Sequence, residues 1–149
     1  MATSSPFVIV VGVDGSPASQ AALDWGMEEA RLRKGQVIVL ASWAYPYVTD
    51  AAGQAWDYTG FERDARLILD GELRRADDPA VPVTGRLVEG NPVAALVEAS
   101  READLLIVGS RGLGGFSGML LGSVSAQLAH HARCPVLIIR SGAEGDTAD

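Results

Sequence analysis

Residues 7–17 read FVIVVGVDGSP, an apolar run that ends in an aspartate and a glycine and is followed at once by a Ser-Pro pair. Continuous rather than alternating hydrophobicity indicates a strand with both faces covered, as in a parallel sheet between layers of helices. Ser16 and Pro17 form a typical helix start, because serine caps the first turn and proline suits the first helical position. The stretch therefore predicts a strand, a tight turn and a helix.

The same alternation of strand and helix signals continues to residue 140. Apolar runs predict strands at residues 7–13, 37–43, Leu105–Gly109 and Val136–Ile139. A weaker strand at residues 81–89 contains Pro82, which favours a sheet edge. Helical spacing predicts helices at residues 17–34, 61–76, 92–103 and 123–131. With right-handed crossovers, this order predicts a single α/β domain: a doubly wound, five-stranded parallel sheet with helices on both faces, which is a Rossmann-like fold.

The composition excludes several classes of protein. The chain has 149 residues, of which 48% are hydrophobic and 21% charged, so we expect one globular domain rather than a disordered or fibrous protein. Its net charge of -7 disfavours binding to nucleic acid. No apolar run approaches the roughly 20 residues that cross a bilayer, and the single cysteine, Cys134, fits a reducing compartment. We expect a cytoplasmic protein without a membrane segment.

The two ends of the chain and one internal segment do not follow the alternating pattern. We expect a domain at residues 7–140, a disordered N-terminus at residues 1–6 and a flexible acidic tail at residues 141–149. Residues 44–59 are longer than an ordinary strand-to-helix loop and carry several aromatic side chains, which in a loop more often pack against the protein than bind a ligand. The role of this segment stays open.

Residues 109–123 read GSRGLGGFSGMLLGS, with six glycines in fifteen residues. Glycine lets backbone N–H groups approach phosphate oxygens, and a helix that begins at Ser123 would add unpaired amides and the positive end of its dipole. The other interpretation is a flexible surface loop in which Ser123 only caps a helix, and the glycines alone do not decide between the two. A Walker loop is excluded because the only lysine, Lys34, is far from this loop, and the dinucleotide fingerprint is absent after the first strand.

The glycine spacing resembles a known signature. Gly109, Gly112, Gly122 and Ser123 match G-2x-G-9x-G-(S/T), the pattern of nucleotide-binding members of the universal stress protein family. Other segments are similar to the family too, at residues 7–16, 37–43, 103–109 and 134–140. The resemblance thus covers nearly the whole chain, and it implies a fold of the adenine nucleotide alpha hydrolase-like type.

The resemblance also implies ATP as the bound cofactor, with Mg²⁺ bridging its phosphates. Asp14 and Gly109 would face the ribose, and the backbone around Ser42 would meet the edge of the adenine. An aspartate in this place could instead cap the first helix, but Ser16 and Pro17 already supply that start, which favours a ligand role for Asp14.

On the phosphate side, the resemblance implies contacts through the backbone amides of Gly112, Gly122, Ser123 and Val124, helped by the Ser123 hydroxyl. Arg111 lies between two glycines of the signature and would balance phosphate charge. We assign no catalytic residue and no metal ligand of the protein itself.

In function, the resemblance implies a regulatory module that binds ATP and alters its contacts with an unknown protein partner during stress or growth arrest. The alternative is a slow ATP hydrolase or phosphoryl-transfer enzyme, which would need a positioned base and strong neutralisation of developing charge. Asp14 and Arg111 are the only obvious charged candidates for these roles. The resemblance further implies a homodimer through the last strand, Val136–Ile139, and a symmetric pair would close an open apolar strand edge.

Overall fold

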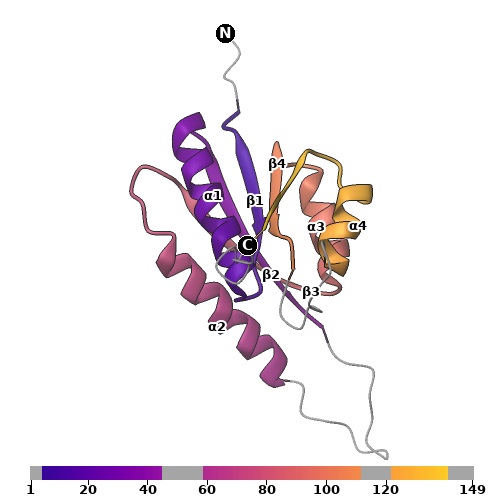
Figure 1. Cartoon of the computed structure of the whole chain (residues 1–149). Helices are drawn as coiled ribbons and strands as arrows, with labels where there is room; N and C mark the ends of the chain where they lie inside the picture. The colour runs from indigo at the N-terminus through magenta and orange to yellow at the C-terminus, as the bar shows by residue number, and fades with distance from the viewer. Residues whose placement is uncertain (1–4, 45–58, 112–121, 141–149) are drawn as a thin grey trace, which may run out of the picture.

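The computed structural model describes residues 5–44, 59–111 and 122–140, which form a layered α/β domain (Figure 1). Strands and helices alternate along the chain: β1 (Val8–Gly12), α1 (Pro17–Arg33), β2 (Gln36–Trp43), α2 (Thr59–Arg75), β3 (Val83–Glu89), α3 (Pro92–Ser100), β4 (Leu105–Gly109), α4 (Ser123–His131) and β5 (Val136–Ile139). All neighbouring strands are parallel, in the order β3-β2-β1-β4-β5. The predicted doubly wound, five-stranded sheet is confirmed, and β3 lies at an edge as its proline indicated.

Two helices cover each face of the sheet. α1 and α2 pack on one face, and α3 and α4 pack on the other (Figure 1). Successive side chains of a strand point to opposite faces, so Ile9 and Val11 of β1 join the core under α1 and α2, whereas Val10 joins the core under α3 and α4. Burial on both faces is the reason why the strands read as continuous apolar runs.

Two helices begin where the sequence indicated. Ser16 caps α1, and its Oγ accepts a hydrogen bond from the Ser19 N–H at 3.2 Å. Asn91 caps α3 in the same way, accepting from the Val93 N–H at 2.8 Å. α4 differs, because its cap is Gly122, a residue without a side chain.

Some element ends differ from the expected ones by one to three residues. α3 ends at Ser100 rather than at residue 103, because the N–H groups of the next three residues donate to carbonyls three positions back and tighten the last turn. β3 begins at Val83 rather than at residue 81, since Pro82 has no N–H to donate. The Pro82 carbonyl still accepts from the Val37 N–H at 2.9 Å.

Several predicted segments lie outside the described residues. They are residues 1–4 of the expected disordered N-terminus, residues 45–58 of the aromatic segment, residues 112–121 of the glycine-rich loop with Gly112 among them, and the acidic tail at 141–149. Among the helices that are described, none has the length and apolar character needed to cross a membrane.

Candidate functional site

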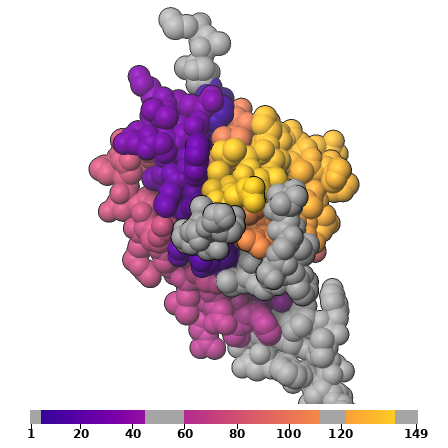
Figure 2. All heavy atoms as spheres, in the orientation of Figure 1, coloured from indigo at the N-terminus to yellow at the C-terminus, as the bar shows by residue number. Residues whose placement is uncertain are grey.

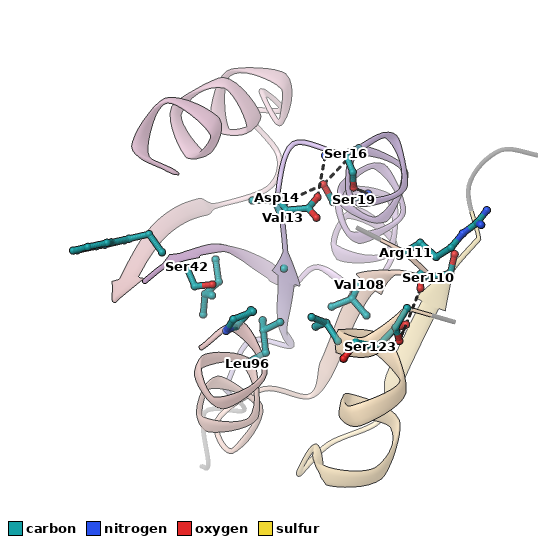
Figure 3. A pocket seen from close by; sticks show the side chains of 18 of the residues that line it. Val13, Asp14, Ser16, Ser19, Ser42, Leu96, Val108, Ser110, Arg111 and Ser123 are labelled. Carbon is teal, nitrogen blue, oxygen red and sulfur yellow. Dashed lines mark hydrogen bonds between the residues drawn. The ribbon is translucent and has the colours of Figure 1, made fainter. Parts of the chain in front are cut away.

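A cavity of about 460 Å³ opens at the carboxyl ends of the central strands (Figure 3). The chain winds outward from β1 in both directions, first through β2 and later through β4. Doubly wound sheets bind their ligands at such a switch point, and the volume lies within the range of roughly 300–1,000 Å³ that is usual for small-molecule sites. The walls come from the loop after β1, the ends of β2 and β4, and the starts of α3 and α4.

Seven of the eight predicted site residues line this cavity: Asp14, Ser42, Gly109, Arg111, Gly122, Ser123 and Val124. They come from the ends of three different strands and the start of α4. The eighth, Gly112, lies outside the described residues. The parallel sheet thus brings segments that are far apart in the sequence to a single edge.

Asp14 is held in a tight turn between β1 and α1. Its Oδ1 accepts a hydrogen bond from the Ser16 N–H at 2.9 Å, and its own N–H donates to Ser19 Oγ at 3.2 Å. Gly15 has a φ of 84°, a left-handed conformation that glycine adopts readily. Because Ser16 caps α1, the Asp14 carboxylate does not have that task, and Figure 3 shows it beside the cavity at the end of β1.

Gly109 ends β4 directly under α1. A Cβ atom at this position would lie 2.6 Å from Ala18 Cβ and 2.7 Å from the Ala18 carbonyl carbon, closer than real Cβ atoms come. Glycine at this signature position is therefore explained by the close approach of α1 to the sheet. The residue borders the cavity as well.

Gly122 brings the start of α4 against the end of β4. Its N–H donates to the Ser110 carbonyl, and a Cβ here would lie 3.1 Å from Ser110 O and 3.3 Å from Arg111 Cα. The Gly122 amide thus has a partner within the protein. The amides of Ser123 and Val124 lie in the first turn of α4, where a helix offers them no carbonyl, and both residues line the cavity.

Two buried serines that the sequence did not single out link these elements. Ser125 Oγ donates to Ser110 O at 2.8 Å, and the Ser110 N–H donates to the Ile139 carbonyl at 2.7 Å. α4, β4 and β5 are therefore connected next to the cavity, which both serines line. The only sequence signal for Ser125 was its place in the first turn of the predicted helix.

Another part of the cavity wall is largely apolar. Leu40, Leu96 and Val108 contribute from β2, α3 and β4. Gly12 leaves room there, because a Cβ at that position would lie 3.0 Å from Leu96 Cδ1 and 3.3 Å from Val108 Cγ1. Within its own segment Leu96 resembles an ordinary core residue of a helix, and its place at the cavity depends on how α3 packs on the sheet.

Charge is sparse around the cavity. Asp14 and Arg111 are the charged side chains among the described lining residues, and in Figure 3 Arg111 extends outward past the end of β4. Within the described ranges, no three His, Cys, Asp or Glu side chains gather as a set of metal ligands. An apolar wall that faces a helix N-terminus suits a ligand with a flat apolar ring at one end and an anionic group at the other.

The fold and the cavity define a Rossmann-like α/β domain of the kind that holds small ligands at its switch point. Comparison with known proteins specifies the family. The model of the universal stress protein family matches residues 7–140, and the chain belongs to this family.

Two curated relatives illustrate the similarity in sequence. Universal stress protein Rv2005c of Mycobacterium tuberculosis is 38% identical over 134 residues, which cover 89% of this chain and 45% of the relative. A universal stress protein of Mycolicibacterium smegmatis is 36% identical over 141 residues, covering 93% of this chain and 47% of the relative. The chain therefore spans about half the length of these relatives.

Solved structures share the fold. A universal stress protein in complex with cAMP is 33% identical, with a TM-score of 0.68 over 92% of this chain and 98% of that one. Hypothetical protein MJ0577 has a TM-score of 0.80 at 20% identity, covering 94% of this chain and 99% of that one. A family member from Arabidopsis thaliana with AMP bound has a TM-score of 0.68 at 21% identity, covering 97% of each chain. At these lower identities, the likeness concerns the fold alone.

Proposed function

We propose that this chain is an ATP-binding universal stress protein, a nucleotide-dependent regulatory module that alters protein contacts in stress response or growth arrest. The observation that supports it most is the convergence of Asp14, Ser42 and the start of α4 on one cavity. The relative whose structure is described as a complex with cAMP supports an adenine nucleotide as the ligand class.

In this proposal the nucleoside lies between the apolar wall and the end of β2. The adenine contacts Leu40, Leu96 and Val108 and meets the backbone at Ser42, all of which line the cavity. The Asp14 carboxylate accepts hydrogen bonds from the ribose hydroxyls, since an ionised carboxylate only accepts.

The phosphates lie at the start of α4. There the N–H groups of Ser123 and Val124 and the Ser123 hydroxyl donate to phosphate oxygens, with the helix dipole favouring negative charge. Mg²⁺, when bound, would be held by the phosphates and would neutralise part of their charge. Arg111 adds a positive charge at the rim.

We propose binding rather than hydrolysis. A hydrolase needs a base that can reach the attacking water, and in this proposal the Asp14 carboxylate is engaged with the ribose hydroxyls at the other end of the nucleotide. We therefore propose retention of the nucleotide, with binding and release as the regulatory event.

Self-association is the second part of the proposal. β5 is an edge strand, and its ladder with β4 uses the carbonyls of Pro135 and Ile139, which accept from Leu106 and Ser110. Because successive backbone groups alternate in direction, the N–H and C=O groups of Val136 and Ile138 face outward. We propose that two copies pair there as a homodimer, in the cytoplasm, where the lone Cys134 stays reduced.

Calorimetric titration with ATP, ADP, AMP and cAMP tests the ligand. Ser123→Pro is the sharpest variant, because it deletes one backbone donor at the first helical position, where proline is accepted. Loss of one hydrogen bond to a charged group should weaken ATP binding by about 1.5–3 kcal/mol, with a smaller loss for adenosine, which has no phosphate. Ser123→Ala serves as the matched deletion of the hydroxyl alone. If the folded wild-type protein binds none of the four nucleotides at millimolar concentration, the proposed ligand class is wrong.

A further inference from the structure

Two large apolar side chains are exposed on one flank of α1. Trp25 is 51% exposed and Leu32 is 69% exposed, and seven residues, about two helical turns, separate them, so both lie along the same side of the helix. α2 approaches the other side of α1, where Asp24 pairs with Arg75 at 3.3 Å. Since α2 packs on β2 and β3, the flank with Trp25 and Leu32 is turned toward β5.

This flank lies level with the middle of β5. A Cβ atom at Gly26, the neighbour of Trp25, would lie 2.7 Å from Val11 Cγ2 and 3.6 Å from Ile107 Cδ1, so this part of α1 sits over β1 and β4. Ile107 is in register with Leu137 of β5. Trp25 therefore stands at the level of Leu137, whose side chain belongs to the same face of the sheet.

β5 is less covered than the inner strands. Leu106 and Ile107 of β4 are completely buried, whereas Val136, Leu137 and Ile138 are all half-buried. Figure 2 looks toward this edge, with the yellow atoms near the end of the described chain between the indigo and purple atoms of α1 and the gold atoms of α4. Apolar side chains thus continue from the flank of α1 onto the edge strand.

If two β5 strands paired, a gap would remain above the Leu137 residues, between the α1 helices of the two copies. Antiparallel pairing across a two-fold axis normal to the sheet puts both copies of α1 on the same face. Each α1 lies about two strand spacings from that axis, so the two helices would be roughly 19 Å apart at about 4.8 Å per strand. Helices in direct contact are only 8–10 Å apart, so the space between them needs large side chains from both copies.

We infer that the flank of α1 with Trp25 and Leu32 is part of the surface that binds a second copy of this chain, and that the two Trp25 side chains close over the paired Leu137 residues. This inference rests on the homodimer of the proposed function. The inference extends that proposal by assigning residues of α1 that fill the gap above the strand pair. The patch is self-complementary, as a two-fold interface requires, because the same side chains meet from both sides.

The test measures the dimer dissociation constant by sedimentation equilibrium of the full chain. The double variant Trp25→Ala/Leu32→Ser should weaken the dimer at least about 100-fold, since two large apolar side chains are lost from each copy. Leu67→Ser is the matched control, because Leu67 of α2 is 62% exposed, nearly as much as Leu32, but lies on a helix that covers β2 and β3. The control should change the constant less than threefold, and thermal unfolding should confirm that all variants are folded.

The outcomes separate this inference from the proposal on which it rests. A wild-type dimer that is weakened equally little by the double variant and by Leu67→Ser overturns the role of α1 and leaves pairing through β5 standing. A wild-type protein that stays monomeric at high micromolar concentration overturns both. Cross-linking is a second measurement, made in a Cys134→Ser background. A flexible bis-maleimide should link two copies of the Trp25→Cys variant but not two copies of Leu67→Cys. A dimer in which Trp25→Cys is not cross-linked also contradicts the inference.

Discussion

Replacing Gly109 with alanine separates two explanations for this signature glycine. If the glycine only makes room for a ribose, the methyl group should weaken nucleotide binding and leave the free energy of unfolding unchanged. The structure favours a different reason, because the new Cβ would lie 2.6 Å from Ala18 Cβ and 2.7 Å from the Ala18 carbonyl carbon. Ordinary van der Waals contact begins at 3.4 Å. Since backbone atoms of α1 are involved, no rotamer change relieves the clash, and the helix itself has to move.

Overpacking of this kind costs about 1–3 kcal/mol of the free energy of unfolding. With a urea dependence of about 2 kcal/mol per molar, the unfolding midpoint followed by circular dichroism should fall by about 1 M. Gly71→Ala is the control, because its Cβ would meet only Arg74 Nη2 at 3.9 Å, and alanine within a helix should stabilise by about 0.5–1 kcal/mol. A Gly109→Ala protein that is as stable as wild type, yet binds ATP poorly, would refute the packing explanation and support the explanation by a ribose contact.

Substitutions at three further residues probe the site and the core. Asp14→Ala should weaken ATP binding by about 1.5–3 kcal/mol, and Asp14→Asn by less, since its side-chain oxygen still accepts from the Ser16 N–H; calorimetry that finds equal affinities for all three proteins would exclude Asp14 from the ribose site. Ser125→Ala should lower the free energy of unfolding in urea by about 1 kcal/mol through loss of its hydrogen bond to Ser110 O, and no change would show that this link adds nothing. Burial, and then the charge of Asp104, raise the pKa of Cys134 above its ordinary value of 9.0. The folded chain therefore holds the thiol proton more tightly than the unfolded chain. This contribution to stability is complete below the ordinary pKa of 9.0, and it is lost as the pH rises from there through the raised pKa of the folded chain. Unfolding measured on both sides of that pH should show a decline that is smaller in Cys134→Ala, and identical declines would contradict the shift.

Local signals in the sequence predicted much of the fold. The strands appeared as continuous apolar runs because both faces of the sheet are covered. Ser16 marked the start of α1, because a side-chain acceptor followed by proline is typical of the first turn, and Asn91 before Pro92 caps α3 in the same way. The end of α3 was harder to predict, because its residues after Ser100 continue as a tightened turn whose composition still reads as helix.

The candidate site was predictable only in part. Asp14, Ser42 and the start of α4 came from the resemblance to a family, and the parallel sheet brings them to the same edge. The apolar wall was missed, because Leu40, Leu96 and Val108 each look like ordinary core residues in their own segment. Their shared cavity follows from the packing of α3 against two strands, and a single sequence carries no local mark of such a contact.

The two described glycines of the signature, Gly109 and Gly122, act on different helices. Gly109 lets α1 lie close to β4, and Gly122 lets the start of α4 lie against Ser110 and Arg111. The helices differ, however, in how their first turns are capped. Ser16 Oγ accepts from the Ser19 N–H of α1, so part of that helix start is already satisfied by the protein.

At α4 the cap residue has no side chain that could do the same. The amides in its first turn therefore have no cap from the Gly122 side chain, in a place where the helix dipole favours an anion. A glycine followed by a serine at the start of α4 therefore combines two features, close approach of the helix to the strand end and an N-cap residue that makes no side-chain cap hydrogen bond. Within the proposed function, this combination is the reason for placing the phosphates at α4 rather than at α1, although both helices begin at the same cavity.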